Sequence, residues 1–267
     1  MKFEVMEIYL GYIGAFFIGF ILGLAGCGGS VLAVPILVYL MHLNLVTATA
    51  YSLFIVGTSS AFGTVRNIQK GIVETKMAFI FAIPSFIAVF LTRKFIVPAI
   101  PDIVFESDNL IITRDFFLMI LFAVLMLFSG ISMLRGDVED KDFTTKYNPA
   151  FIFFTTIVVG VVIGLVGAGG GFLIVPALFF MLKLSIRKAI GTSLLIITLN
   201  SLIGFTGDIG NVAIDWGFLL GFTGISVFGI VIGLGLSKYV NEQQLKKGFG
   251  WFVLIMAIFI FTKELFL

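Results

Sequence analysis

The chain is poor in charged residues and almost free of cysteine and histidine. Only 12% of its 267 residues are Asp, Glu, Lys or Arg, whereas 60% are hydrophobic, and the mean hydropathy is +1.16. Cys27 is the single cysteine and His42 the single histidine, which excludes an intrachain disulfide and the usual zinc sites. A net charge of +2 without charged blocks offers no surface for nucleic acid. The composition predicts an all-α polytopic membrane protein whose surroundings are the lipid bilayer.

One stretch of the sequence occurs twice. Residues 19–37 read GFILGLAGCGGSVLAVPIL, and residues 160–178, displaced by 141 positions, read GVVIGLVGAGGGFLIVPAL, with ten of nineteen positions identical. Each copy is an apolar helix, a glycine cluster and a short apolar segment with a proline, Pro35 or Pro176. Such breaks survive in hydrocarbon only when they are buried in protein or line a cavity. Paired breaks in two halves of a chain point to a transporter binding site.

Each half of the chain is predicted to contain five apolar segments. In the first half they cover about residues 8–25, 31–42, 48–65, 77–98 and 114–134. In the second half they cover about residues 151–167, 172–182, 189–206, 216–237 and 249–266. The second segment of each half is too short to cross about 30 Å of hydrocarbon. We therefore expect a first transmembrane repeat (residues 1–134), a linker (residues 135–149) and a second transmembrane repeat (residues 150–267).

Lys and Arg in the connections predict the orientation, because they favour the cytoplasmic face. The connections alternate between two faces, and the basic residues divide twelve against five. The face with five carries Lys2, Arg93, Lys94, Arg114 and Lys263. We expect both termini on this outer face of the cytoplasmic (inner) membrane and the linker inside the cell. Equivalent connections of the two halves have opposite charge bias, which predicts inverted repeats. The charges do not decide whether the first two segments of each half span or re-enter.

With these features, the chain resembles the TauE/SafE sulfite-exporter family of anion transporters. The resemblance rests on the doubled glycine–proline pattern, the length and the two-half organisation, and it covers essentially the whole chain. It implies transport of sulfite, thiosulfate or small organosulfonates such as sulfoacetate, with no metal or organic cofactor. The exact anion, the direction, the coupling ion and the oligomeric state, a homodimer included, stay open.

The residues at the two glycine breaks themselves indicate an anion site. A helix restarts after each break, so its first amide groups lack partners within the helix and its dipole adds about half a positive charge. Glycine lets an anion approach the backbone, and Ser30 can cap the helix or add a hydroxyl donor. Pro35 and Pro176 each free a carbonyl group or permit bending, which suits a gate. The predicted substrate-binding residues here are Gly26, Cys27, Gly28, Gly29, Ser30, Gly167, Ala168, Gly169, Gly170 and Gly171. The alternative is that these glycines only allow close helix packing.

The third segment of each half carries a matched stripe of small and polar residues at helical spacing. The stripe comprises Ser52, Val56, Ser59, Ser60, Gly63 and Asn67, and, 141 residues later, Ser193, Ile197, Asn200, Ser201, Gly204 and Asp208. Such a stripe should face the protein interior or a water-filled route. We expect Ser52, Ser59, Ser193 and Asn200 to bind substrate, the alternative being hydrogen bonds between helices.

No acidic or basic residue is expected clearly inside a span, which argues against a buried carboxylate relay or a fixed cation that holds the anion. The predicted function is a secondary transporter or facilitator for small sulfur-containing anions. The alternative is a carrier or channel for another small solute, including a cation bound by freed carbonyl groups. An intramembrane enzyme is disfavoured, because His42 is the only histidine that could activate a serine or cysteine.

Overall fold

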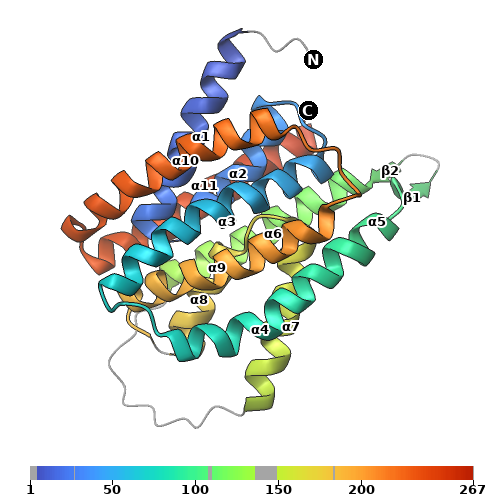
Figure 1. Cartoon of the computed structure of the whole chain (residues 1–267). Coiled ribbons are helices and arrows are strands. Elements are labelled where there is room, and N and C mark those ends of the chain that lie inside the picture. Colours follow the sequence, from blue (N-terminus) through green and yellow to red (C-terminus); the bar gives the residue numbers. More distant parts are fainter. Residues whose placement is uncertain (1–4, 27, 108–109, 136–148, 183, 267) are drawn as a thin grey trace.

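The computed structural model describes residues 5–26, 28–107, 110–135, 149–182 and 184–266, and these residues are almost entirely helical (Figure 1). Cys27 and most of the linker lie outside the described residues. The remaining candidate residues all lie within described segments, so their positions can be compared with the predictions.

The first half contains the five helical segments that the hydropathy predicts, with one addition. Its helices are α1 (Val5–Ala25), α2 (Gly28–Pro35) with the π-helical turn Ile36–Leu40, α3 (Leu45–Gln69), α4 (Thr75–Leu91), and α6 (Arg114–Arg135). A π-helical turn (Thr92–Ile96) and the short α5 (Val97–Ala99) extend α4. The addition is an antiparallel hairpin between α5 and α6, formed by β1 (Ile103–Ser107) and β2 (Leu110–Thr113).

The second half repeats the order of helices. It comprises α7 (Pro149–Val166), α8 (Gly171–Met181), α9 (Ile186–Asp208), α10 (Trp216–Leu236), a 3₁₀ turn (Ser237–Tyr239) and α11 (Glu242–Phe266). Within the described residues, seven helices are long and apolar enough to cross a membrane, whereas α2, α7 and α8 are shorter. The prediction of an all-α polytopic membrane protein is confirmed.

One row of helices lies side by side in the order α1, α10, α3, α9, α4 and the shorter α7 (Figure 1). The central helices α3 and α9 run antiparallel, because Gly57 lies against Leu202 whereas Gly63 lies against Leu194. By contrast, α3 runs parallel to α10, since Gly63 also contacts Ile230, four residues after the Ser226 that meets Ser59.

The contacts of the outer helices repeat under the 141-residue offset. A side chain added at Gly19 of α1 would overlap the backbone of Ser226 in α10, and one at Gly160 of α7 would overlap the backbone of Ser85 in α4. Gly160 is 141 residues after Gly19, and Ser85 is 141 residues before Ser226. The second contact is therefore the first one with the two halves exchanged. Helices that are equivalent in the sequence therefore exchange partners and run in opposite directions.

The short helices α2 and α8 lie behind this row, together with the long helices α6 and α11. The pair α6 and α11 pack antiparallel to each other, with Gly130 against Leu254 and Gly250 against Leu134. Helix α2 contacts α11, α8 contacts α6, and α2 and α8 contact each other. The two short helices that follow the glycine breaks are thus enclosed by long ones.

Candidate functional site

The break between α7 and α8 brings the start of α8 to the middle of the bundle. Gly169, with φ of 66°, lies against Val56 near the middle of α3 and against Ser201 near the middle of α9. A left-handed conformation of this kind favours glycine, and a side chain here would also meet Ser201. The first amide groups of α8 therefore start beside the polar stripe.

The first break is less open than the sequence suggests. A side chain added at Gly29 would overlap the carbonyl oxygen of Ile18 in α1. This glycine is therefore needed for the close approach of α1 and α2, which is the packing role that the sequence left open. The remaining candidates at the breaks are buried where burial is described: Gly26, Ser30, Gly167, Ala168, Gly170 and Gly171, with Gly28 opening α2. Cys27 lies outside the described residues.

The two prolines occupy different places in their helices. Pro35 is the last residue of α2 and is followed by a π-helical turn, in which Met41 donates from its amide to Ile36. Pro176 lies inside α8. Both are buried, so each has the position of a residue that shapes the helix after a break.

Every residue of the two stripes is buried, as the stripe predicts. Some of their polar groups bind neighbouring helices. Ser59 donates to Ser226 at 2.9 Å, and Asn200 donates to Ser85 at 2.7 Å, so the two bonds are equivalent under the offset. Ser193 donates to the carbonyl oxygen of Gly26 at 3.2 Å, which ties α9 to the first break.

Other polar atoms of the stripes are buried without a hydrogen-bond partner among the described residues. They are the hydroxyl groups of Ser52, Ser60 and Ser201, the amide nitrogen Nδ2 of Asn67 and the amide oxygen of Asn200. Ser60 and Ser201 are equivalent under the 141-residue offset, yet neither was selected from the sequence as a binding residue. A buried polar group without a partner costs free energy, which indicates a ligand or water at that position.

A buried ion pair contradicts the expectation that no charged residue lies within a span. Arg93, in the π-helical turn that extends α4, is fully buried, and Asp208 at the end of α9 is 2% exposed. The guanidinium Nε lies 2.9 Å from both carboxylate oxygens, and Nη2 lies 2.8 Å from Oδ1. Both charges escape the cost of solitary burial because they neutralise each other.

A cavity of about 900 Å³ lies next to this pair, between the ends of α5 and α9 and the starts of α3, α6 and α10. Asp208 belongs to its lining, together with Tyr51, Arg114 and Asp215. None of the described residues that were predicted to bind substrate lines it, although Tyr51 precedes Ser52. Within the described part of the chain, no group of three or more His, Cys, Asp or Glu side chains could hold a metal ion.

Comparisons with known proteins place this geometry in context. A family model described as "Sulfite exporter TauE/SafE" matches residues 12–260. A "Probable membrane transporter protein" from Xylella fastidiosa is 30% identical over 254 residues, which cover 92% of each chain. A protein of the same description from Haemophilus influenzae is 28% identical, over 92% of this chain and 94% of the relative. The "Probable membrane transporter protein YunE" of Bacillus subtilis is 24% identical over 92% of each chain. No solved structure matches the chain.

Proposed function

Because the chain belongs to the sulfite exporter TauE/SafE family, we propose that it is a secondary transporter or facilitator of small sulfur-containing anions. The family and its relatives identify a membrane transporter. Sulfite, thiosulfate and small organosulfonates such as sulfoacetate are the substrates that we infer. The transporter names of the relatives favour a protein that is not an enzyme.

The observation that carries this proposal is the meeting of the α8 start with an unpartnered serine. Gly169 is close enough to Ser201 that an added Cβ would lie 3.0 Å from its hydroxyl oxygen. Ser201 is fully buried and has no hydrogen-bond partner among the described residues. Amide groups of a helix start and a hydroxyl group are all donors that an oxyanion accepts, and they need no fixed cation.

The equivalent serine of the first half extends the site. Ser60 is as buried and as unpartnered as Ser201, within the part of the chain that the structure describes. We infer that the starts of α2 and α8, together with these two hydroxyl groups, hold an anion from opposite sides. Ser52 provides a further unpartnered hydroxyl group on the stripe of α3. The unpartnered amide oxygen of Asn200 only accepts hydrogen bonds, so it suits a donor such as water or a protonated substrate group rather than the anion's charge.

The carbonyl groups near the breaks bear on the alternative of a cation substrate. The carbonyl oxygen of Gly26 accepts from Ser193, and that of Gly164 accepts from Arg93 at 3.4 Å. Both are thus engaged by donors of the protein, which makes them poor ligands for a cation. The amide groups at the start of α8 can only donate, and they favour an anion over a cation. The unpartnered hydroxyl of Ser201 can donate beside them.

A thermal-shift panel on purified protein tests the substrate class. It compares sulfite, thiosulfate, sulfate, sulfoacetate and taurine as sodium salts or free acids, with sodium chloride as the reference. We expect at least one sulfur oxyanion to raise the melting temperature more than chloride does, because a ligand that binds only the folded state stabilises it. Melting temperatures in every sulfur oxyanion equal to that in sodium chloride would contradict the proposal.

A further inference from the structure

The buried ion pair breaks the symmetry between the two halves. The position equivalent to Arg93 is Leu234, and the position equivalent to Asp208 is Asn67, so the second arrangement is neutral. The helix packing around the two positions is otherwise matched, since Ser59 meets Ser226 as Asn200 meets Ser85. A neutral pair is therefore compatible with this packing, and the charged pair needs a reason other than stability.

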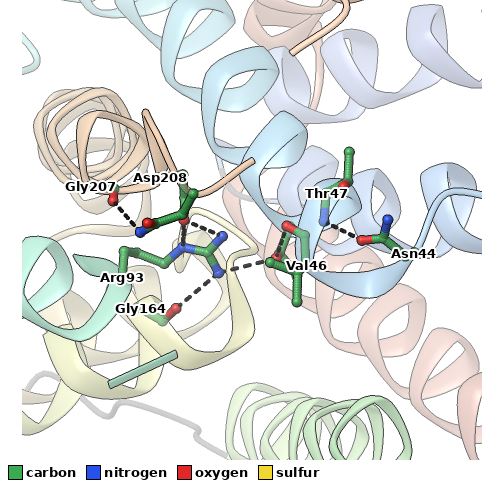
Figure 2. A network of polar contacts seen from close by, with 9 residues as sticks. Asn44, Val46, Thr47, Arg93, Gly164, Gly207 and Asp208 are labelled. Carbon is green, nitrogen blue, oxygen red and sulfur yellow. Dashed lines mark hydrogen bonds and ion pairs between the residues drawn. The ribbon is translucent and has the colours of Figure 1, made fainter. Parts of the chain in front are cut away.

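Arg93 joins four helical segments at this place (Figure 2). Its Nη1 donates to the hydroxyl oxygen of Thr49 in α3 at 3.1 Å and to the carbonyl oxygen of Gly164 in α7. Its Nε and Nη2 hold Asp208 of α9. A side chain added at Gly167 would overlap Thr49, so this threonine connects Arg93 directly to the second glycine break.

The pair lies between the cavity and the proposed anion site. Asp208 lines the cavity, whereas Arg93 is fully buried behind it, next to the end of α7. An anion that enters the cavity and moves toward the start of α8 therefore passes the pair. On this path the anion meets the guanidinium group of Arg93, and it competes with the carboxylate of Asp208 for that group.

The other charged groups around Asp208 are already compensated or exposed. On the segment of Arg93, Lys94 is exposed and lies over the rings of Phe90 and Phe95. On α6, Arg114 pairs with Asp102 at 2.9 Å and lies 3.8 Å from Asp115. Before α10, Asp215 accepts from the amide of Phe218. The packed helix α7 carries no charged residue, and in α3 the only one is Arg66, near the opposite end.

We propose that Asp208 binds a proton when an anion reaches Arg93, so that the carrier moves one proton together with each anion; this rests on the proposed function. Two negative groups cannot share one buried guanidinium group without repulsion, which favours the neutral form of the carboxyl group. Protonation of Asp208 removes one of the two negative groups from Arg93, so the site is neutral with a monovalent anion and carries one net negative charge instead of two with a divalent anion such as thiosulfate. The neutral counterpart of this pair, Leu234 and Asn67, has no such role.

Proton uptake during anion binding tests this proposal. Thiosulfate is added to the purified, weakly buffered protein, because it stays ionised from neutral to mildly acid pH, and a pH indicator and calorimetry follow protons and affinity. We expect about one proton per thiosulfate, and an affinity that rises by up to about tenfold for each unit of decrease in pH. The variant Arg93→Leu/Asp208→Asn, which copies the neutral counterparts Leu234 and Asn67, should take up no proton.

The control variant is Asp215→Asn, which alters another carboxylate of the same cavity and can keep its bond to Phe218. It should take up protons as the wild type does. Binding of thiosulfate to the wild type without proton uptake, or unchanged uptake in the double variant, would overturn the proton site while the anion carrier stands. If no anion of the panel binds the wild type, the proposed function fails and this inference fails with it.

Discussion

At the scale of single residues, the sequence treats the two glycine breaks alike, whereas the structure gives their glycines different surroundings. Gly169 could be selected because the glycine cluster is duplicated, and the structure places it beside Ser201. Gly29 was selected for the same reason, yet it lies against the backbone of α1. The sequence alone cannot distinguish a glycine that lets a ligand approach the backbone from one that lets a neighbouring helix pack closely, since both require the absence of a side chain.

Arg93 was missed because hydropathy assigns it, with its neighbour Lys94, to the polar end of a span. The helical spacing of Arg93 relative to buried residues indicates that its side chain faces the protein interior. Arg93 follows the buried Ser85 and Val89 by eight and four residues, so it continues their inward face, whereas Lys94 does not. Asp208 belongs to the predicted stripe, and it is the only acidic residue of α9, the helix that packs against Arg93.

Gly29→Ala tests the packing role of the first break. The added methyl group would overlap the carbonyl oxygen of Ile18, so α1 and α2 must separate. We expect a loss of about 1–3 kcal/mol or more in the free energy of unfolding, as is typical of overpacking. Gly235→Ala is the matched control, because nothing lies within 4 Å of its added methyl group. Thermal unfolding in detergent measures both, and equal stability of the two variants would contradict this role.

At the scale of helices, all ten apolar segments could be predicted, because long apolar runs and the repeat mark them independently. Two features escaped prediction. The π-helical turns after Pro35 and after α4 have the same apolar composition as α-helix, so the sequence gives no period to distinguish them. The β1–β2 hairpin has short runs rich in β-branched residues, IVFES and LIIT, which hydropathy places in the connection between two spans.

The equivalent hydrogen bonds between helices should stabilise the bundle. Asn200→Ala and Ser85→Ala each remove one partner of the 2.7 Å bond between α9 and α4. A double-mutant cycle on unfolding free energy should give a coupling of about 0.6 kcal/mol, the average for such bonds in membranes, and at most about 1.7 kcal/mol. The control cycle pairs Asn200→Ala with Ser226→Ala in α10, a residue that binds Ser59 instead. Coupling of the same size in both cycles would contradict a direct bond.

At the scale of the whole molecule, charged groups from distant connections gather at opposite ends. Burial lowers the pKa of Lys70, and the positive charges of Arg66, Lys238 and Arg187 lower it further, so basic residues of three segments lie together. At the other end, His42 lies 3.3 Å from Glu7 near the start of α1, on the side where the residues after it line the cavity. This grouping agrees with the two faces deduced from the sequence, although the assignment of each face to a side of the membrane stays a prediction.

Cysteine labelling tests that assignment. Single cysteines are placed in the linker (residues 135–149) or near either end of the chain, in a Cys27→Ala background that leaves no other thiol. In intact cells, an impermeant reagent should label the terminal positions and not the linker, because the face richer in Lys and Arg is expected inside. The reverse labelling would contradict the orientation. Crosslinking at the same positions would also report whether the chain forms a homodimer.

The anion site at the start of α8 is the central claim, and it is tested most directly by calorimetric titration of serine variants with the anion that stabilises the protein best. Ser201→Ala removes a hydroxyl group that has no partner among the described residues, so stability should be unchanged while affinity falls. A hydrogen bond to a charged group is worth about 1.5–3 kcal/mol, which corresponds to a roughly ten- to hundredfold loss of affinity.

Ser59→Ala is the matched control in the same titration. The stripe predicts that Ser59 binds substrate, but its hydroxyl group already binds Ser226, as the alternative of hydrogen bonds between helices requires. This variant should therefore lose stability and keep its affinity for the anion. The account predicts a large loss of affinity in Ser201→Ala and in its equivalent Ser60→Ala. Wild-type affinity in both variants, with the protein folded, would contradict an anion held at the start of α8.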